Sequence, residues 1–473
     1  MNVPPRRPLF YRKQGPNIYR LFFLVVMILG GIWFIRLMDK GEVKPLFLPT
    51  ATPTRFSGSY AMEGDAQFTA GNMDAAIVAY QEAVRIDPNN AEVWAKLARI
   101  QTYSSSLLTT DDERRLRLAA ALESAQKATE LAPDDSFAHA IHAFVLDWNA
   151  NPTLIEDDQV QKYLLQAEQE ANRALLLDST NTLALAFYAE ILVDQQKWEQ
   201  ARINILQALE RDPSLMDVHR VYAYVLESFG DYNQAIQEYN TAISISPNLT
   251  FLHLRAGANY RRLALASANE DTARDLYEKS LEYFAQAASI NEQLGVKDPI
   301  PYLSISKTYS QMGEFFIAAR NVQKALEFQP DNADVYGQLG VIYFKSRNYE
   351  GSIPALKCAI HGCTADESCD GRGGCGPNDT PAEVTGLALS PSTVVYYYIY
   401  GSVLAALSRP QDNRCPEAME VLSEVKADFG SDPDIAGIIS AGEAICSSLG
   451  DTAAAAPVNT PEAMLGETAT PSP

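Results

Sequence analysis

The chain has 473 residues, of which 47% are hydrophobic and 21% charged, and its formal net charge is −21. At this length one ordinary core does not suffice, so the chain is expected to form several domains or a repeat array. The charge is uneven, because residues 1–20 carry +5 whereas the part from Ser57 onward carries −28. A surface this acidic repels phosphate backbones, so we expect no nucleic-acid partner.

The first predicted element is an apolar helix. An uncharged run, LFFLVVMILGGIWFI, lies between Arg20 and Arg36. With its flanking residues it predicts a transmembrane helix over residues 19–38. A cleaved signal peptide is the alternative, but no pair of small residues follows at cleavage spacing. The basic residues before the helix place the tail 1–18 in the cytoplasm and the rest of the chain outside it.

Low-complexity segments flank the central part of the chain. Residues 39–56 contain Pro and Thr without a helical period and are predicted to form an extended linker. The tail at 450–473 is predicted to be disordered. Helical patterns fill residues 57–360 and 393–449, and a Cys- and Gly-rich insertion at 361–392 separates them.

An internal repeat covers most of residues 57–430. Aromatic and small residues recur at fixed offsets, most clearly in Tyr336-x2-Leu339-Gly340-x2-Tyr343 and His253-x2-Ala256-Gly257-x2-Tyr260. This resembles the tetratricopeptide repeat (TPR), whose 34-residue unit reads W-x2-L-G-x2-Y…A-x3-F…P. The resemblance implies an all-α solenoid of antiparallel helix pairs wound into a right-handed superhelix. Because no unit can bury its apolar face alone, neighbouring units must stack.

Nine units follow from this register, and Asp432–Ser448 is predicted to be a closing helix. Units two, three and six carry insertions, and units three, six and eight lack the final Pro. The predicted units are 57–90, 91–135, 136–181, 182–215, 216–249, 250–298, 299–332, 333–360 and, in degenerate form, about 394–429.

No constellation of catalytic residues is found in the sequence. His139, His219 and His253 each occupy the fourth position of a unit, where the repeat has an aromatic residue, so they are interpreted as packing residues. His142 follows one turn after His139 without a third ligand nearby. No nucleophile elbow, phosphate-binding loop or zinc-protease motif occurs. We therefore expect no enzymatic activity, cofactor, metal or small-molecule substrate.

Six cysteines lie beyond residue 350, four of them in the segment Cys358–Thr380 with His361 among them. No C-x2-C pair of the kind used by zinc sites occurs, and outside the cytoplasm disulfides are expected. A bridge between Cys415 and Cys446 would lock the end of the solenoid, although the connectivity stays open. The disulfide candidates are Cys358, Cys363, Cys369, Cys375, Cys415 and Cys446.

The TPR resemblance also implies a concave groove lined by positions five, nine, twelve and thirteen of each first helix. Basic residues recur at these positions from unit five onward, which favours an anionic peptide, for example a C-terminal carboxylate. The Lys and Asn pattern of the family's carboxylate-binding members is absent, and solvated surface charges are the alternative. The candidate partner-binding residues are Arg220, Tyr224, Leu254, Arg261, Arg262, Leu303, Lys307, Gln311, Phe344 and Lys345.

The sequence therefore predicts a non-catalytic scaffold for protein–protein interaction, tethered to a membrane, that binds a partner peptide or helix in its groove. Two alternatives stay open. One is a regulatory subunit that responds to metal or redox state through the Cys-rich insertion. The other is the same solenoid facing the cytoplasm as an adaptor.

Overall fold

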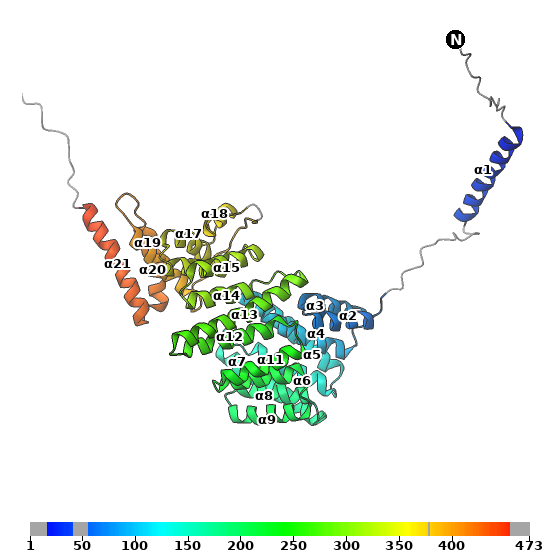
Figure 1. Ribbon diagram of the computed structural model, residues 1–473, viewed down its shortest axis with the longest axis horizontal. Coiled ribbons are helices and arrows are strands. Elements are labelled where there is room, and N and C mark those ends of the chain that lie inside the picture. Colours follow the sequence, from blue (N-terminus) through cyan, green and yellow to red (C-terminus); the bar gives the residue numbers. More distant parts are fainter. Residues whose placement is uncertain (1–16, 41–54, 377–378, 455–473) are drawn as a thin grey trace, which may run out of the picture. The chain divides into compact units, whose positions relative to one another are not determined.

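The computed structural model describes residues 17–40, 55–376 and 379–454 (Figure 1). The chain divides into two units, Met1–Arg55 and Phe56–Pro473, which we describe separately. The predicted basic tail, the centre of the predicted linker and the predicted C-terminal tail lie almost entirely outside the described residues.

The first unit contains the helix α1, which spans Ile18–Asp39. Asn17 caps it, because its side chain accepts a hydrogen bond of 3.2 Å from the backbone N–H of Tyr19. The stretch Ile18–Met38 has a mean hydropathy of 2.4 and is apolar on all sides, so it is long enough to cross a bilayer. A membrane anchor and a signal sequence share these properties.

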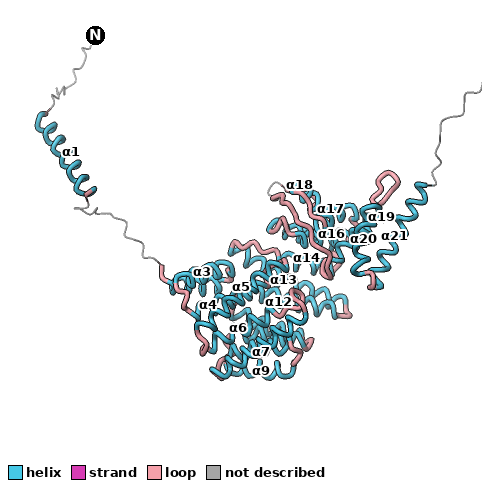
Figure 2. The backbone as a smooth tube through the Cα atoms, turned by 180° about the vertical axis from the view of Figure 1, so that it is seen from behind, coloured by secondary structure: helices cyan, strands magenta, loops and turns pink. Residues whose placement is uncertain are grey.

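In the second unit, antiparallel helical hairpins follow one another in chain order (Figures 1 and 2), and the predicted all-α, TPR-like fold class is confirmed. Among the described residues, the paired helices are α2 (Ser57–Ala70) with α3 (Met73–Ile86), α4 (Ala91–Ser105) with α5 (Asp111–Leu131), α6 (Ser136–Asn149) with α7 (Asp157–Leu177), α8 (Thr182–Asp194) with α9 (Trp198–Arg211), α10 (Met216–Ser228) with α11 (Tyr232–Ile245), α12 (Thr250–Ala266) with α13 (Glu270–Leu294), α14 (Ile300–Gln311) with α15 (Phe315–Phe328), α16 (Ala333–Lys345) with α17 (Tyr349–Ile360), and α19 (Val394–Leu407) with α20 (Cys415–Phe429).

Two further helices complete this unit. The short helix α18 (Ala365–Gly371) lies in the Cys-rich insertion and contacts α17. The last helix, α21 (Pro433–Ala454), packs against α19 and α20 and closes the array. Figure 2 shows that long loops run beside α18, where the repeat pattern is interrupted.

Polar caps mark the starts of many of these helices. The side chain of Asn72 accepts a hydrogen bond from the N–H of Ala75 at the start of α3, and Asn181 and Asn348 cap α8 and α17 in the same way. Each cap satisfies one of the backbone N–H groups that the first helical turn leaves without a partner. The chain therefore stops and restarts helices at short, regular intervals.

In several repeat units, the residue at the fourth position of the first helix of the hairpin has the same role in the turn that joins it to the preceding repeat unit. Its side chain bonds the backbone carbonyl of the Pro that ends the preceding unit, six residues earlier. Indole, imidazole and phenol groups all reach this carbonyl, which explains why histidines share the position with aromatic residues. The pairs are Trp94–Pro88, His139–Pro133, His219–Pro213, His253–Pro247 and Tyr336–Pro330, at 2.8–3.1 Å.

Small residues set the separation of the paired helices. A Cβ atom on Gly257 of α12 would lie 2.7 Å from the ring of Phe284 on α13. A Cβ atom on Gly340 of α16 would lie 2.5 Å from Leu356 on α17. Such distances are shorter than carbon–carbon contacts in packed cores, so only glycine permits this approach.

Contacts between hairpins that are far apart in the sequence close the first part of the solenoid on itself. The ring of Tyr103 on α4 stacks on Phe251 of α12 with centroids 4.9 Å apart. Its hydroxyl donates to Asp217 of α10, which also pairs with Arg99 of α4. The inner face of the array is therefore packed with side chains between its second and sixth hairpins.

Candidate binding site

The candidate site lies on the inner face of the first helices, where a cavity remains open. Its volume is about 720 Å³, within the range of pockets that hold ligands. Helix α7 supplies the largest share of its wall, α12 and the helices α6, α8 and α10 supply further residues, and α11 and α14 contribute one residue each. Of the predicted partner-binding residues, Arg220, Tyr224 and Leu254 line this cavity.

Arg220 is held in a buried ion pair within the wall of the cavity. Its two terminal nitrogens donate to Glu190 at 2.7 and 2.5 Å, and the two residues are 5% and 4% exposed. The guanidinium also lies 5.4 Å from the ring centroids of Tyr103 and Phe144. Trp148 donates to the same carboxylate at 3.1 Å. Arg220 is thus engaged within the protein, with Glu190 as its anion.

The remaining carboxylates of the wall have unusual protonation behaviour. Burial raises the pKa of Asp147 well above its usual range, and the negative charges of Asp194 and Glu190 add to this effect. Burial also raises the pKa of Asp194 to about 6, although the hydrogen bond from Tyr224 acts in the opposite direction. Tyr224 donates to Asp194 at 2.5 Å. Both shifts favour the protonated form, so these two carboxyl groups ionise less readily than exposed ones.

Basic residues gather farther along α12 and α14. Arg261 donates to the carbonyl of Ser304 at 3.1 Å, and Arg262 pairs with Glu227 at 3.0 Å. Partial burial, together with the charges of Arg261 and Arg262, lowers the pKa of Lys307. Burial and the charge of Arg262 lower the pKa of Arg261 to about 10. These three residues form a positively charged region, which we call the basic cluster.

The other predicted groove residues lie away from the cavity. Leu303 and Phe344 are half-buried and pack against the apolar core of the C-terminal hairpins, whereas Gln311 and Lys345 are exposed. The structure therefore brings together the members from α10 and α12 and distributes the rest along α14 and α16.

Asp147, Glu190 and Asp194 are not among the site residues predicted from the sequence. They occupy positions twelve, nine and thirteen of their first helices, the same positions that were read as groove-lining in units five to eight. Applying that register to units three and four would have found them. Their function depends on neighbours from α10, which only the folded chain provides.

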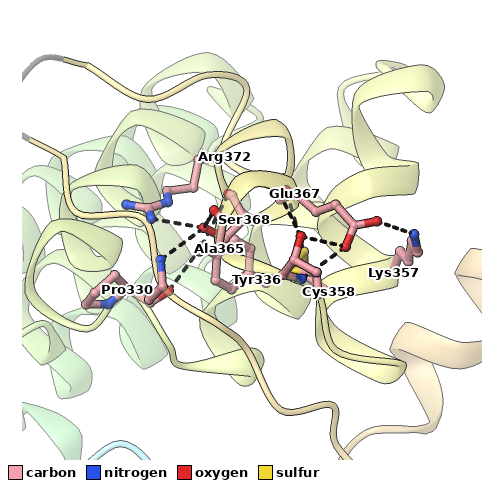
Figure 3. Close-up of a disulfide and its surroundings, with 11 residues drawn as sticks. Pro330, Tyr336, Lys357, Cys358, Ala365, Glu367, Ser368 and Arg372 are labelled. Atoms are coloured by element: carbon pink, nitrogen blue, oxygen red, sulfur yellow. Dashed lines mark hydrogen bonds and ion pairs between the residues drawn. A yellow bond between two sulfur atoms is a disulfide. The ribbon is translucent and has the colours of Figure 1, made fainter.

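All six cysteines are paired in disulfides: Cys358–Cys363, Cys369–Cys375 and Cys415–Cys446. Figure 3 shows the surroundings of the first bridge, where Lys357 pairs with Glu367 at 2.8 Å and Tyr336 donates to the carbonyls of Pro330 and Ser368. Within the described part of the chain, no three His, Cys, Asp or Glu side chains are placed to hold a metal ion. The insertion is thus a disulfide-pinned loop against α16 and α17.

Two parts of the chain match models of known families. Residues 64–101 match a model described as TPR repeat, and residues 188–249 match one described as tetratricopeptide repeat. Together with the hairpin array, these matches identify the chain as a TPR repeat protein. No curated protein matches the chain in sequence.

Several solved structures are similar in fold. The human IFIT1 dimer with m7Gppp-AAAA is 15% identical, with 87% of this chain and 93% of that chain covered and a TM-score of 0.51. The human IFIT1 dimer with PPP-AAAA is 15% identical over 84% and 92% of the chains, with a TM-score of 0.49. A thermophilic TPR protein of Thermus thermophilus is 17% identical over 43% and 98%, with a TM-score of 0.36. At 15% identity, the likeness to the first of these structures concerns the fold alone.

Proposed function

We propose that the protein is a membrane-tethered scaffold whose TPR array binds an extended segment or helix of a partner protein. The observation that carries this proposal is the cavity of about 720 Å³ on the inner face of the array. TPR domains generally bind proteins, and their stacked hairpins present such concave surfaces. Both α12 and α14 contribute to the cavity and to the basic cluster, so one bound segment would meet both.

The tether in this proposal is α1, with the array outside the cytoplasm. Two observations support it: the apolar span Ile18–Met38, and three disulfides, which persist in oxidising compartments. The basic residues that precede the helix favour a cytoplasmic N-terminus.

The proposed membrane topology can be tested by protease treatment of intact cells. We expect an external protease, applied after removal of any outer barrier, to digest the TPR array while a tag fused before Met1 stays protected. The membrane fraction should retain the full-length chain, because an anchor is not cleaved. An array that is protected until the membrane is opened would indicate the cytoplasmic adaptor, and a mature soluble chain that lacks α1 would indicate a signal sequence.

The basic cluster should contribute to partner binding. Reversing two of its charges in the combined variant Arg261→Glu and Lys307→Glu should reduce crosslinking of the partner in membranes on the order of tenfold, because opposite charges on the bound segment are then repelled. Mass spectrometry of the crosslinked products would identify the partner and quantify its yield.

A matched control separates this effect from a general change of net charge. Arg274→Glu with Arg202→Glu reverses two exposed charges on the second helices α13 and α9, neither of which lines the cavity. This control should crosslink as the unaltered protein does. Equal yields from both variants would show that the basic cluster takes no part in binding.

A further inference from the structure

The charges in the cavity wall do not balance. Of the two arginines of the wall, Arg220 pairs with Glu190, and Arg255 pairs at 3.0 Å with Glu227, which also pairs with Arg262. Asp147, Asp157 and Asp194 line the same cavity, and none of them forms an ion pair within the described part of the chain. The cavity therefore presents carboxyl groups without a counter-charge, and a cation that enters it would favour their ionised form.

Asp147 is the most informative of these carboxylates. It is 2% exposed, and neither of its side-chain oxygens has a hydrogen-bond partner. Burying a carboxylate without a donor is costly, so native proteins rarely leave one in this state without a functional reason. A cationic group in the cavity would supply the missing donors and the missing charge.

The shape and lining of the cavity indicate which cation fits. The described side chains offer no set of three metal-ligating groups, so the donors do not suit a bound metal ion. Apolar residues, among them Val160, Leu164 and Phe251, form much of the wall beside the acids. An apolar wall next to an acidic end matches a long aliphatic stem that ends in a charged group.

We propose that this cavity binds the side chain of a lysine or arginine residue of the partner polypeptide, with Asp147 and Asp194 as the acceptors. This inference rests on the proposed scaffold function and specifies what the scaffold recognises. Arginine and lysine both donate several hydrogen bonds, enough for two carboxylates. The basic cluster on α12 and α14 would then bind an acidic part of the same segment.

Binding of defined peptides to the full-length protein in detergent micelles tests the proposal. The probes are fluorescent alanine-rich peptides whose central residue is lysine, arginine, norleucine or glutamate, and fluorescence anisotropy measures their affinity. We expect the lysine or arginine peptide to bind at least tenfold more tightly than the norleucine peptide, which has the same stem without the charge. Equal affinities, no binding of either basic peptide, or free n-butylamine binding as tightly as the lysine peptide would overturn it.

Two neutral variants locate the effect in the cavity. Asp147→Asn and Asp194→Asn should each weaken binding of the preferred basic peptide by about 10- to 100-fold, because each removes a charged acceptor. Asp147→Asn should not lower the unfolding temperature, since it removes a buried carboxylate that lacks a partner. The control Glu210→Gln removes an exposed carboxylate of α9 outside the cavity and should leave binding unchanged.

Photo-crosslinking in membranes distinguishes failure of this inference from failure of the scaffold function. A photoreactive amino acid replaces Gln161, an exposed residue in the cavity wall. Capture of a polypeptide that disappears in the combined Asp147→Asn and Asp194→Asn variant supports the inference. Capture that persists in this variant overturns the inference and leaves the scaffold function standing. No capture from this position or from the basic cluster counts against the scaffold function itself.

Discussion

Replacing Arg220 by alanine should lower the free energy of unfolding by about 3–5 kcal/mol, the loss expected when one partner of a buried ion pair is removed. The variant leaves the carboxylate of Glu190 without its ion-pair partner, although this residue is only 4% exposed. Among the described hydrogen bonds, the one from the indole N–H of Trp148 at 3.1 Å would then be the only one that Glu190 retains. It also removes the guanidinium that lies 5.4 Å from the ring centroids of both Tyr103 and Phe144. Both effects act on the hairpins that form the cavity.

Denaturant unfolding of the full-length chain, followed by circular dichroism, would measure this loss. Arg274→Ala, an exposed arginine of α13, serves as the control and should change the free energy of unfolding by less than about 0.5 kcal/mol. The double variant with Glu190→Ala should recover part of the loss, because the stranded charge is then absent. An Arg220→Ala variant as stable as the control would show that the pair carries no net stability.

Removing the Cys415–Cys446 bridge should destabilise the C-terminal end of the array by about 3–4 kcal/mol. The two residues are separated by 31 positions, and the chain-entropy model assigns this amount to a closed loop of that length. Among the described helices, α21 has substantial contacts only with α19 and α20. The loss of stability should therefore stay confined to this end of the array. Hydrogen exchange of the Cys415→Ser and Cys446→Ser variant should show faster opening of α20 and α21 and unchanged exchange in α4–α11.

A shorter loop provides the matched control. Cys369 and Cys375 are separated by 6 positions, so the same model predicts a smaller loss of about 2 kcal/mol, confined to α18 and its loop. Reduction of the unaltered protein should reproduce both effects together. Identical exchange of α21 with and without the Cys415–Cys446 bridge would contradict the prediction.

The repeat register explains why so much of the fold is readable from the sequence. A hairpin of two helices repeats every few tens of residues, so its glycine, aromatic and proline positions recur and reinforce one another. The interpretation of His139, His219 and His253 as residues of the repeat agrees with their shared bonds to the preceding Pro. These contacts join residues within one repeat unit or between neighbouring repeat units. They can therefore be predicted from the spacing of residues along the sequence.

The binding surface was less predictable, for a physical reason. Arg220 was selected because it is basic and lies at a groove position, but its charge is engaged by Glu190 from the neighbouring hairpin. Whether a charged side chain on an inner face meets a partner protein or its own chain depends on which side chain lies opposite. That choice does not follow from the position within one repeat.

The sequence by itself determined the class of this protein: an all-α TPR array with an apolar helix before it, in which each hairpin must bury its apolar face against the next. Only the tertiary structure decided how the array closes, with Tyr103 stacked on Phe251 and an acidic cavity left between α6 and α12. The small rotation from each hairpin to the next accumulates along the chain. Contacts between distant hairpins therefore depend on a sum of many packing geometries, which no single repeat contains.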